Sequence, residues 1–194
     1  ASSSSVYGSN TKVPFSETDR VDSPESLYAV TKKTDEAMAH VYHRLYNISV
    51  TGLRFFTVYG PWGRPDMALF LFTRKMLAGE PIPVFNHGQH RRDFTYVDDA
   101  AHATVLAMEK DLSNEVFNVG TGVSTSLSDL AQMMIKVMGG DTSVEYKSNE
   151  RVDDVTYRKA ATEKAENMLG FRSEFDLETG LRNLVEWWRT QPKE

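Results

Sequence analysis

The chain has 194 residues, of which 40% are apolar and 11% aromatic, a composition that suits a globular protein with a sizeable core. Its net charge of −5 excludes a broad electrostatic attraction to nucleic acid or to an anionic membrane. The chain contains no cysteine, and its histidines form no metal-binding set, so we expect no metal site. No apolar run is long enough to cross a membrane and no signal-peptide pattern begins the sequence, which favours the cytoplasm.

The first predicted elements are a polar start, a loop and a long helix. Residues 1–5 are typical of a flexible tail, although the following Val6-Tyr7-Gly8 indicates a strand end entering a loop. After a polar loop, Ser23 can cap a helix with Pro24 in its first position, and we expect this helix over about 23–47. Its predicted apolar face consists of Leu27, Val30, Thr34, Ala37, Met38, Val41 and Leu45.

Strand and helix patterns then alternate. A β-branched and aromatic run over 50–58 predicts one buried strand, which ends before Gly60-Pro61. A helix over about 68–78 and short strands over 82–85 and 94–97 follow. The remaining predicted elements are a helix from Asp98 or Asp99 to Lys110, a strand over 116–119, a helix over 127–138 with a Ser126–Asp129 capping box, and helices over 162–169 and 177–190.

This alternation predicts an α/β protein with parallel strands. A dinucleotide-binding fingerprint would need a third glycine and an acidic residue after a second strand. Gly120-Thr121-Gly122 follows a strand but lacks both features, so a tight turn is the favoured interpretation.

Tyr28 and Lys32 stand four positions apart, so they project from one face of the predicted helix toward a common ligand. Alone the pair is weak evidence, because an exposed tyrosine beside a solvated lysine is common. Its context is more specific, since conspicuous motifs lie about 25 positions before and after it. The motifs are residues 2–8 (SSSSVYG), 26–33 (SLYAVTKK), 51–68 (TGLRFFTVYGPWGRPDMA), 91–99 (RRDFTYVDD) and 117–120 (FNVG).

Through these motifs the chain resembles the extended short-chain dehydrogenase/reductase superfamily, in particular its nucleotide-sugar epimerases and dehydratases. The resemblance implies the C-terminal part of a Rossmann-type doubly wound parallel sheet with a smaller α/β substrate-binding domain, preceded by a segment with the Gly-rich cofactor loop. Residues 1–60 would be the remnant of the dinucleotide-binding domain with the catalytic helix. Residues 61–194 would mainly bind the nucleotide sugar, with about 82–120 crossing back to the Rossmann part.

The resemblance also implies roles for individual residues in an NAD-dependent oxidation of a sugar hydroxyl. Tyr28 would be the base, and Ser3 would hydrogen-bond the reacting hydroxyl. Lys32 would adjust the acidity of the base and bind the cofactor ribose. The Lys32 ammonium and a positive nicotinamide ring would both favour the phenolate form of the base. Phe55 and Val58 would contact the cofactor together with Tyr28 and Lys32.

The residues after Ser3 indicate which reaction follows. Dehydratases of the superfamily place Asp-Glu there and decarboxylases a glutamate, whereas this chain has Ser4 and Ser5. Hydroxyls supply hydrogen bonds but no carboxylate, which suits simple 4-epimerisation. The closest resemblance is to UDP-glucuronate 4-epimerase, and UDP-glucose 4-epimerase and UDP-glucuronate decarboxylase remain alternatives.

Further residues match positions that contact the substrate in this subfamily. Ser4, Ser5, Thr57 and Arg64 would hold the sugar carboxylate, for which the planar guanidinium is suited. The substrate-binding positions elsewhere are Arg92 and Arg151, which would bind the diphosphate, and Asp154. The sequence Arg151-Val152-Asp153-Asp154 departs from the family pattern Arg-x-Gly-Asp and adds negative charge near a diphosphate.

The implied partners are a UDP-sugar and a second copy of the chain, joined through the helix that carries Tyr28. We expect the isolated chain to be inactive, because most contacts to NAD would come from the preceding segment. Whether the chain alone binds NAD stays open. A protein of another class, a non-catalytic UDP-sugar-binding or dimerisation fragment, is the remaining alternative.

Overall fold

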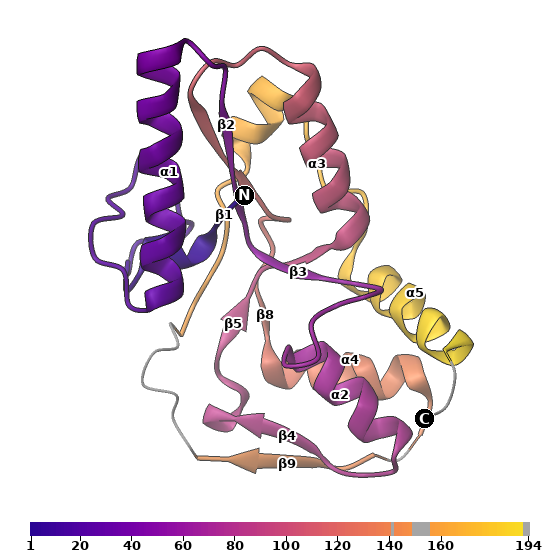
Figure 1. The fold of residues 1–194 in the computed structure, drawn as a ribbon. Coiled ribbons are helices and arrows are strands. Elements are labelled where there is room, and N and C mark those ends of the chain that lie inside the picture. Colours follow the sequence, from indigo (N-terminus) through magenta and orange to yellow (C-terminus); the bar gives the residue numbers. More distant parts are fainter. Residues whose placement is uncertain (141, 149–155, 192–194) are drawn as a thin grey trace.

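The computed structural model describes residues 1–140, 142–148 and 156–191. It confirms an α/β fold with parallel strands, arranged as two bodies (Figure 1). The larger body contains β1 (Ser2–Ser3), η1 (Ser4–Tyr7), α1 (Leu27–Tyr46), β2 (Thr51–Phe55), α3 (Val97–Glu109), β7 (Glu115–Val119) and η3 (Ala165–Leu169). The smaller body contains α2 (Ala68–Leu77), β4 (Ile82–Phe85), η2 (Asn86–Gly88), α4 (Leu127–Met138), β9 (Val144–Lys147) and α5 (Leu177–Thr190). Between them lie β3 (Thr57–Tyr59), β5 (Arg91–Arg92), β6 (Phe94–Tyr96) and β8 (Thr125–Ser126).

The larger body is built on a parallel sheet of order β1-β2-β7, and β2 lies between α1 and α3 (Figure 1). In its register Ser3 is opposite Phe55, and Phe55 is opposite Val119. Because the strands are parallel, these residues share the carboxyl edge of the sheet. The interpretation of residues 1–5 as a flexible tail is therefore wrong: Ser2, Ser3 and Ser4 are buried, since the sheet and α1 enclose them.

The run predicted as one strand over 50–58 forms two strands in different sheets. β2 belongs to the main sheet, whereas β3 pairs in parallel with β6, with Thr57 opposite Phe94. At the break, the Phe56 N–H donates to Val119 O and the Thr57 N–H to Asp93 O, each at 3.0 Å. The residues are strand formers throughout, so local sequence does not reveal this change of hydrogen-bond partner.

Helix α1 begins three positions later than its predicted first residue, Pro24. Its N-cap is Ser26, whose hydroxyl accepts from the Ala29 N–H at 3.1 Å. Ser23 instead packs with its carbonyl against Gly8, where an added Cβ would lie 2.1 Å from the carbonyl oxygen. Ser23 therefore belongs to the loop before the helix, where its backbone packs closely against Gly8.

Helix α3 starts at Val97, and neither aspartate caps it from the predicted N-cap position. Asp99 is buried and its carboxylate accepts from the Ser173 hydroxyl (2.8 Å) and from the Glu174 N–H (2.9 Å). Elsewhere local signals match the structure: Ser126 caps α4, and Gly170, in the left-handed conformation, ends η3, which is wound as a π-helix.

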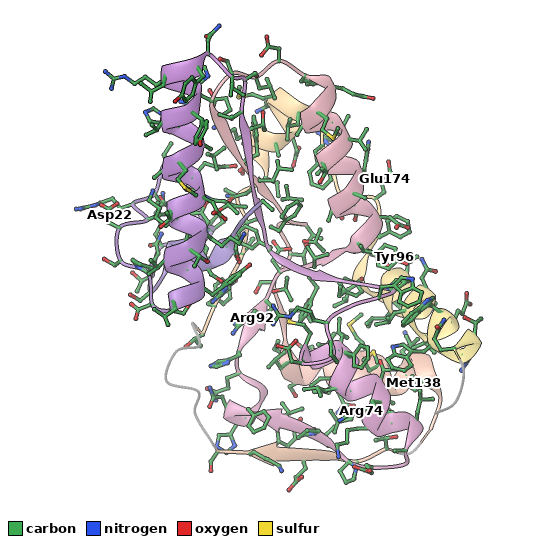
Figure 2. All side chains as sticks on the ribbon, in the orientation of Figure 1. Asp22, Arg74, Arg92, Tyr96, Met138 and Glu174 are labelled. Atoms are coloured by element: carbon green, nitrogen blue, oxygen red, sulfur yellow. The ribbon has the colours of Figure 1, made fainter. Side chains whose placement is uncertain are left out.

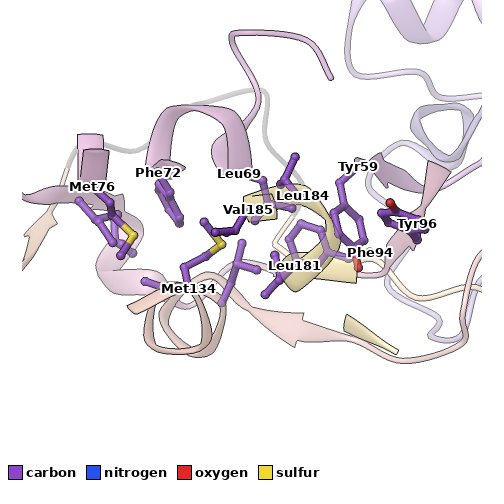
Figure 3. Close-up of a cluster of buried hydrophobic side chains, with 14 residues drawn as sticks. Tyr59, Leu69, Phe72, Met76, Phe94, Tyr96, Met134, Leu181, Leu184 and Val185 are labelled. Carbon is purple, nitrogen blue, oxygen red and sulfur yellow. The ribbon is translucent and has the colours of Figure 1, made fainter. Parts of the chain in front are cut away.

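Two main apolar cores stabilise the bodies. In the larger body, Phe117 and Leu53 of the sheet pack against α3 and η3. In the smaller body, α2, α4 and α5 enclose Phe72, Met134 and Leu184 (Figure 3). Arg92 lies in the region where the two bodies meet (Figure 2). None of the helices in the described ranges is both long and apolar enough to cross a membrane.

Candidate functional site

The carboxyl edge of the main sheet carries the serine run. β1 leads directly into η1, and the Ser3 hydroxyl caps this turn by accepting from the Ser5 N–H at 3.2 Å. The Ser3 hydroxyl also donates to the Ser5 hydroxyl at 3.2 Å. The three consecutive hydroxyls of Ser3, Ser4 and Ser5 are therefore held in one short turn at the end of a buried strand.

Helix α1 places Lys32 beside the same strand. The Lys32 ammonium donates to the Ala1 carbonyl oxygen and to Asp35, both at 3.0 Å. Tyr28, one turn earlier on the helix, is half exposed. The structure thus links the predicted lysine to the strand that carries Ser3, and it leaves the phenol of Tyr28 accessible to a ligand.

A buried ion pair fixes α1 against the sheet. The Arg54 guanidinium on β2 donates to both carboxylate oxygens of Glu36 on α1, at 2.8 and 2.9 Å, and the Ser2 hydroxyl donates to the same carboxylate at 2.6 Å. Burial alone would raise the pKa of Glu36, but the hydrogen bonds from Arg54 and Ser2 hold that pKa below its ordinary value. Glu36 is one turn beyond Lys32, so this pair anchors the predicted catalytic helix.

The network continues from Arg54 to β7. Arg54 donates to the Tyr7 hydroxyl at 3.0 Å, and that hydroxyl donates to the Asn118 side chain at 2.7 Å. Burial raises the pKa of Tyr7 to about 12, so Tyr7 is a structural donor and not a base at neutral pH. Sequence reasoning missed this network. The available signals were a charged residue inside a buried strand and Glu36 four positions after Lys32.

The Arg64 side chain binds a neighbour on its own loop. It follows β3 on an exposed loop and donates to both carboxylate oxygens of Asp66, at 2.9 and 2.6 Å. These hydrogen bonds raise the pKa of Arg64 above its ordinary value, with a smaller electrostatic contribution from Tyr28. The predicted carboxylate-binding arginine therefore already holds an anionic partner, Asp66.

The remaining predicted substrate residues occupy several places. Thr57 is half-buried in β3. Arg92 is half-buried in β5 and donates to the carbonyl oxygens of Arg91 (2.8 Å) and Thr156 (3.4 Å). Arg151 and Asp154 lie outside the described residues.

Sequence reasoning did not select Arg158, which the structure brings to the serine run. Its guanidinium donates to the Ser5 hydroxyl at 3.2 Å and to the Ser4 hydroxyl at 3.5 Å. These contacts span more than 150 positions of sequence, so no local pattern reveals them. Arg158 lies shortly after Arg151, the residue that the resemblance predicts to bind the diphosphate.

The predicted cofactor residues Phe55 and Val58 are half-buried on either side of the β2–β3 break. Phe55 ends its strand at the carboxyl edge and packs against the core of the larger body. No cluster of three His, Cys, Asp or Glu side chains that could hold a metal ion occurs in the described part of the chain.

Backbone N–H groups of the turn after β7 donate to a buried carboxylate of the chain itself. The buried Asp93 carboxylate accepts from the N–H groups of Thr121 (2.8 Å), Gly122 (2.9 Å) and Ala160 (3.1 Å) and from the Thr121 hydroxyl (2.8 Å). Burial raises the pKa of Asp93, and the four donors oppose that rise. These contacts support the interpretation of Gly120-Thr121-Gly122 as a tight turn, in which Gly122 has a φ of 72°.

The fold and the edge define the class: a Rossmann-type α/β protein with a second, smaller body. The chain belongs to the NAD dependent epimerase/dehydratase family, whose sequence model matches residues 1–120.

Relatives and solved structures extend the similarity over nearly the whole chain. UDP-glucuronate 4-epimerase 2 of Arabidopsis thaliana is 45% identical over 204 residues, covering 97% of this chain and 47% of that protein. The crystal structure of UDP-glucuronic acid 4-epimerase from Bacillus cereus with UDP-glucuronic acid and NAD has a TM-score of 0.90 and 35% identity, covering 97% and 60% of the two chains. UDP-glucose 4-epimerase from Thermotoga maritima with UDP-glucose has a TM-score of 0.91 and 37% identity, covering 97% and 62%. The chain thus spans about half to three fifths of the length of these proteins.

Proposed function

We propose that this chain is the sugar-binding and proton-transferring part of an NAD-dependent enzyme that converts UDP-glucuronate to UDP-galacturonate by transient oxidation at C4. The observation that carries the proposal is the turn of three serines at the carboxyl edge of the sheet, beside Lys32. The turn supplies hydroxyls and no carboxylate, which suits simple 4-epimerisation. The similarity to UDP-glucuronate 4-epimerases adds support.

Each residue of the edge has a defined part in this proposal. Ser3 orients the C4 hydroxyl of the sugar, and the Tyr28 phenolate removes its proton. Lys32, one turn along the same helix face, supports Tyr28 in this role and would bind the cofactor ribose. A bound NAD would supply the reversible hydride acceptance that oxidation at C4 requires. Tyr28 then returns the proton, so neither base nor cofactor is consumed.

The described residues fit one part of NAD. An ammonium has three N–H donors, and Lys32 uses two of them, on Ala1 and Asp35, which leaves one for a ribose hydroxyl. Tyr28 is half exposed beside it, and Phe55 and Val58 flank the same edge. Most other cofactor contacts would come from a preceding segment, so the isolated chain is proposed to be inactive.

We also propose the division of labour along the chain. Residues 1–60 carry the remnant of the dinucleotide-binding domain and the catalytic helix, and residues 61–194 mainly bind the nucleotide sugar. The stretch 82–120 crosses back to the Rossmann part, which agrees with the placement of β4 in the smaller body and β7 in the main sheet. Thr57, Arg92, Arg151 and Asp154 complete the proposed substrate site, and the cytoplasm is the proposed location.

A homodimer through α1 is proposed from the exposure of that helix. Among the described residues of α1, only Ala29 is buried as a whole and the Glu36 side chain is buried against the sheet, whereas apolar side chains on the predicted face are open to solvent. Leu27 is 86% and Leu45 65% exposed. A second copy of the same face would remove this apolar surface from water.

One observation favours UDP-glucose as a second candidate substrate. Arg64, the residue predicted to bind the sugar carboxylate, is already paired with the Asp66 carboxylate. Product analysis separates the candidates. The enzyme, with its dinucleotide-binding segment and NAD, is incubated with UDP-glucuronate or UDP-glucose, and the products are resolved by chromatography. Formation of UDP-galacturonate supports the proposal; conversion of UDP-glucose alone, or release of carbon dioxide, refutes it.

A further inference from the structure

Helix α1 lies against the sheet through polar rather than apolar side chains. It contacts β1 and η1 and runs alongside β2 (Figure 1). Besides the buried Ala29, the residues of α1 that are at least partly buried are Lys32, Lys33, Asp35, Glu36, Ala39 and His43. Interlocking apolar side chains normally fix how two elements sit together. No large apolar side chain of α1, which is described throughout, is buried, so its position along the strands depends on directional hydrogen bonds.

These hydrogen bonds converge on the Glu36 carboxylate. One of its oxygens accepts from the Ser2 hydroxyl at 2.6 Å and from the Arg54 Nε at 2.8 Å, and the other accepts from the Arg54 Nη2 at 2.9 Å. Ser2 and Arg54 are opposite each other in the pairing of β1 with β2. The carboxylate is therefore bound to two adjacent strands at the same level. Sliding α1 along the sheet would break all three bonds and leave two buried charges unpaired.

The helix face that Glu36 anchors carries the proposed proton-transferring pair. Tyr28, Lys32 and Glu36 follow one another at intervals of four residues and share one face. At a rise of about 1.5 Å per residue, Glu36 lies about 6 Å along the axis from Lys32 and about 12 Å from Tyr28. On the strand, Glu36 is bound to Ser2, the residue directly before the proposed substrate-orienting Ser3. The anchor is thus close to both sides of the proposed site.

Other contacts of α1 are less able to set this position. The Lys32 ammonium donates to the Ala1 carbonyl oxygen and to Asp35, both at 3.0 Å, but the second contact stays within the helix. The His40 ring contacts the Asn114 side chain at 3.0 Å in an exposed place, one turn further from Tyr28. Water competes for exposed hydrogen bonds, whereas buried bonds between charged groups are the strong ones.

We propose that Glu36, held by Arg54 and Ser2, is a positioning residue that fixes the distance between the Tyr28 face of α1 and Ser3 on β1. This inference rests on the proposed function. A base must lie within about 3 Å of the group whose proton it removes, and a displacement of about 1 Å costs about 100-fold in rate. Glu36 itself touches neither sugar nor cofactor. A folded enzyme with a shifted α1 would therefore bind the UDP-sugar normally and convert it slowly.

The test separates position from stability. The double variant Glu36→Leu with Arg54→Met leaves no charge unpaired and should unfold near the urea midpoint of the wild type. In the NAD-loaded enzyme with its dinucleotide-binding segment, we expect its kcat for UDP-glucuronate to fall about 10- to 100-fold, while KM changes by less than about threefold. Ser2→Ala, which keeps the ion pair, should lower kcat about two- to tenfold.

Asp99→Asn is the matched control for these variants. It changes a buried carboxylate on α3 that accepts from the Ser173 hydroxyl, and β2 separates α3 from α1 (Figure 1). Loss of that carboxylate should lower the urea midpoint and leave kcat at the wild-type value, because the Tyr28 face of α1 stays in place.

A second measurement follows the position of the helix without turnover. The Lys32 side chain is 23% exposed and its ammonium donates to Ala1, so its rate of acylation by acetic anhydride, measured by mass spectrometry, reports on that contact. We expect Lys32 to react faster in the double variant than in the wild type, and at the wild-type rate in Asp99→Asn. Lys110, which donates to the Met168 carbonyl oxygen, is the internal reference.

The outcomes separate this inference from the proposed function. Faster Lys32 acylation together with a lower kcat at unchanged KM supports the positioning role. A stable double variant with wild-type kcat or wild-type Lys32 acylation overturns it, as does an equal fall of kcat in Asp99→Asn. If the double variant does not fold, Ser2→Ala decides by the same two measurements. A wild-type enzyme that does not convert UDP-glucuronate overturns the proposed function, and the acylation of Lys32 then decides whether Glu36 positions α1.

Discussion

The Arg54–Glu36 pair allows a quantitative prediction about how firmly helix α1 is held against the sheet. The side chains are 5% and 8% exposed and joined by two hydrogen bonds. Removing one partner leaves a buried charge without compensation, which costs about 3–5 kcal/mol. Arg54→Gln should therefore lower the melting temperature by about 6–20 °C, since a chain of this size loses about 2–4 °C per kcal/mol.

Urea denaturation followed by far-UV circular dichroism measures the loss in the free energy of unfolding. Arg20→Gln is the control, because its pair with Asp22 is 89% and 57% exposed and should change stability by less than about 0.5 kcal/mol. The double variant Arg54→Met with Glu36→Leu should be more stable than Arg54→Gln, because no charge is left unpaired. If Arg54→Gln unfolds within about 1 kcal/mol of wild type, the pair does not hold the helix as described.

The same pair predicts a pH dependence with a definite sign. The folded-state pKa of Glu36 lies below its ordinary value of 4.5, so the folded state binds the proton less readily than the unfolded state. The contribution of Glu36 is complete above about pH 4.5 and is lost as the pH falls through the lowered pKa. Glu36→Gln should flatten the loss of stability in that acid range, and an unchanged acid profile would contradict the assignment.

Three further substitutions test the site, the junction between the bodies and the exposed helix face. Tyr28→Phe should lower kcat about 10²- to 10⁴-fold in the NAD-loaded enzyme with little change in substrate affinity, whereas Tyr42→Phe on the same helix should not; equal kinetics for both would exclude Tyr28 as the base. Asp93→Asn should destabilise the chain by about 3 kcal/mol in urea denaturation, because an amide N–H₂ would face backbone donors. If the proposed dimer forms through α1, Leu45→Glu should shift it toward monomer in sedimentation velocity. Met108→Glu, at an 80% exposed position on α3, is the control, and a wild-type monomer would refute the proposed interface.

Local signals in the sequence predict much of the fold. Helix α4 has both of its predicted ends because Ser126 caps it and Gly139 stops it, and these residues act within one turn. The predicted start of α1 is wrong: Ser26 caps the helix, and Ser23 lies in the preceding loop with its carbonyl close to Gly8. The break at Phe56 is missed because neighbouring strands determine it.

The site is predictable to the extent that its members are neighbours in sequence. Tyr28 and Lys32 share a helix face, and the serines share a turn, so their pattern is visible without a structure. Arg158 and Ser5 meet through the packing of distant segments, and Arg54 meets Glu36 in the same way. The motif predicts Arg64 as a carboxylate-binding residue, but its guanidinium contacts the nearby Asp66.

The course of the chain between the two bodies has a consequence for protein engineering. After β4 and η2 in the smaller body, the chain runs to β7 in the main sheet, returns to α4 and β9, and then contributes η3 to the larger body before α5. Neither body is therefore encoded by one uninterrupted stretch of gene. A chimera that exchanged the smaller body between relatives would need a compatible junction at each of these crossings.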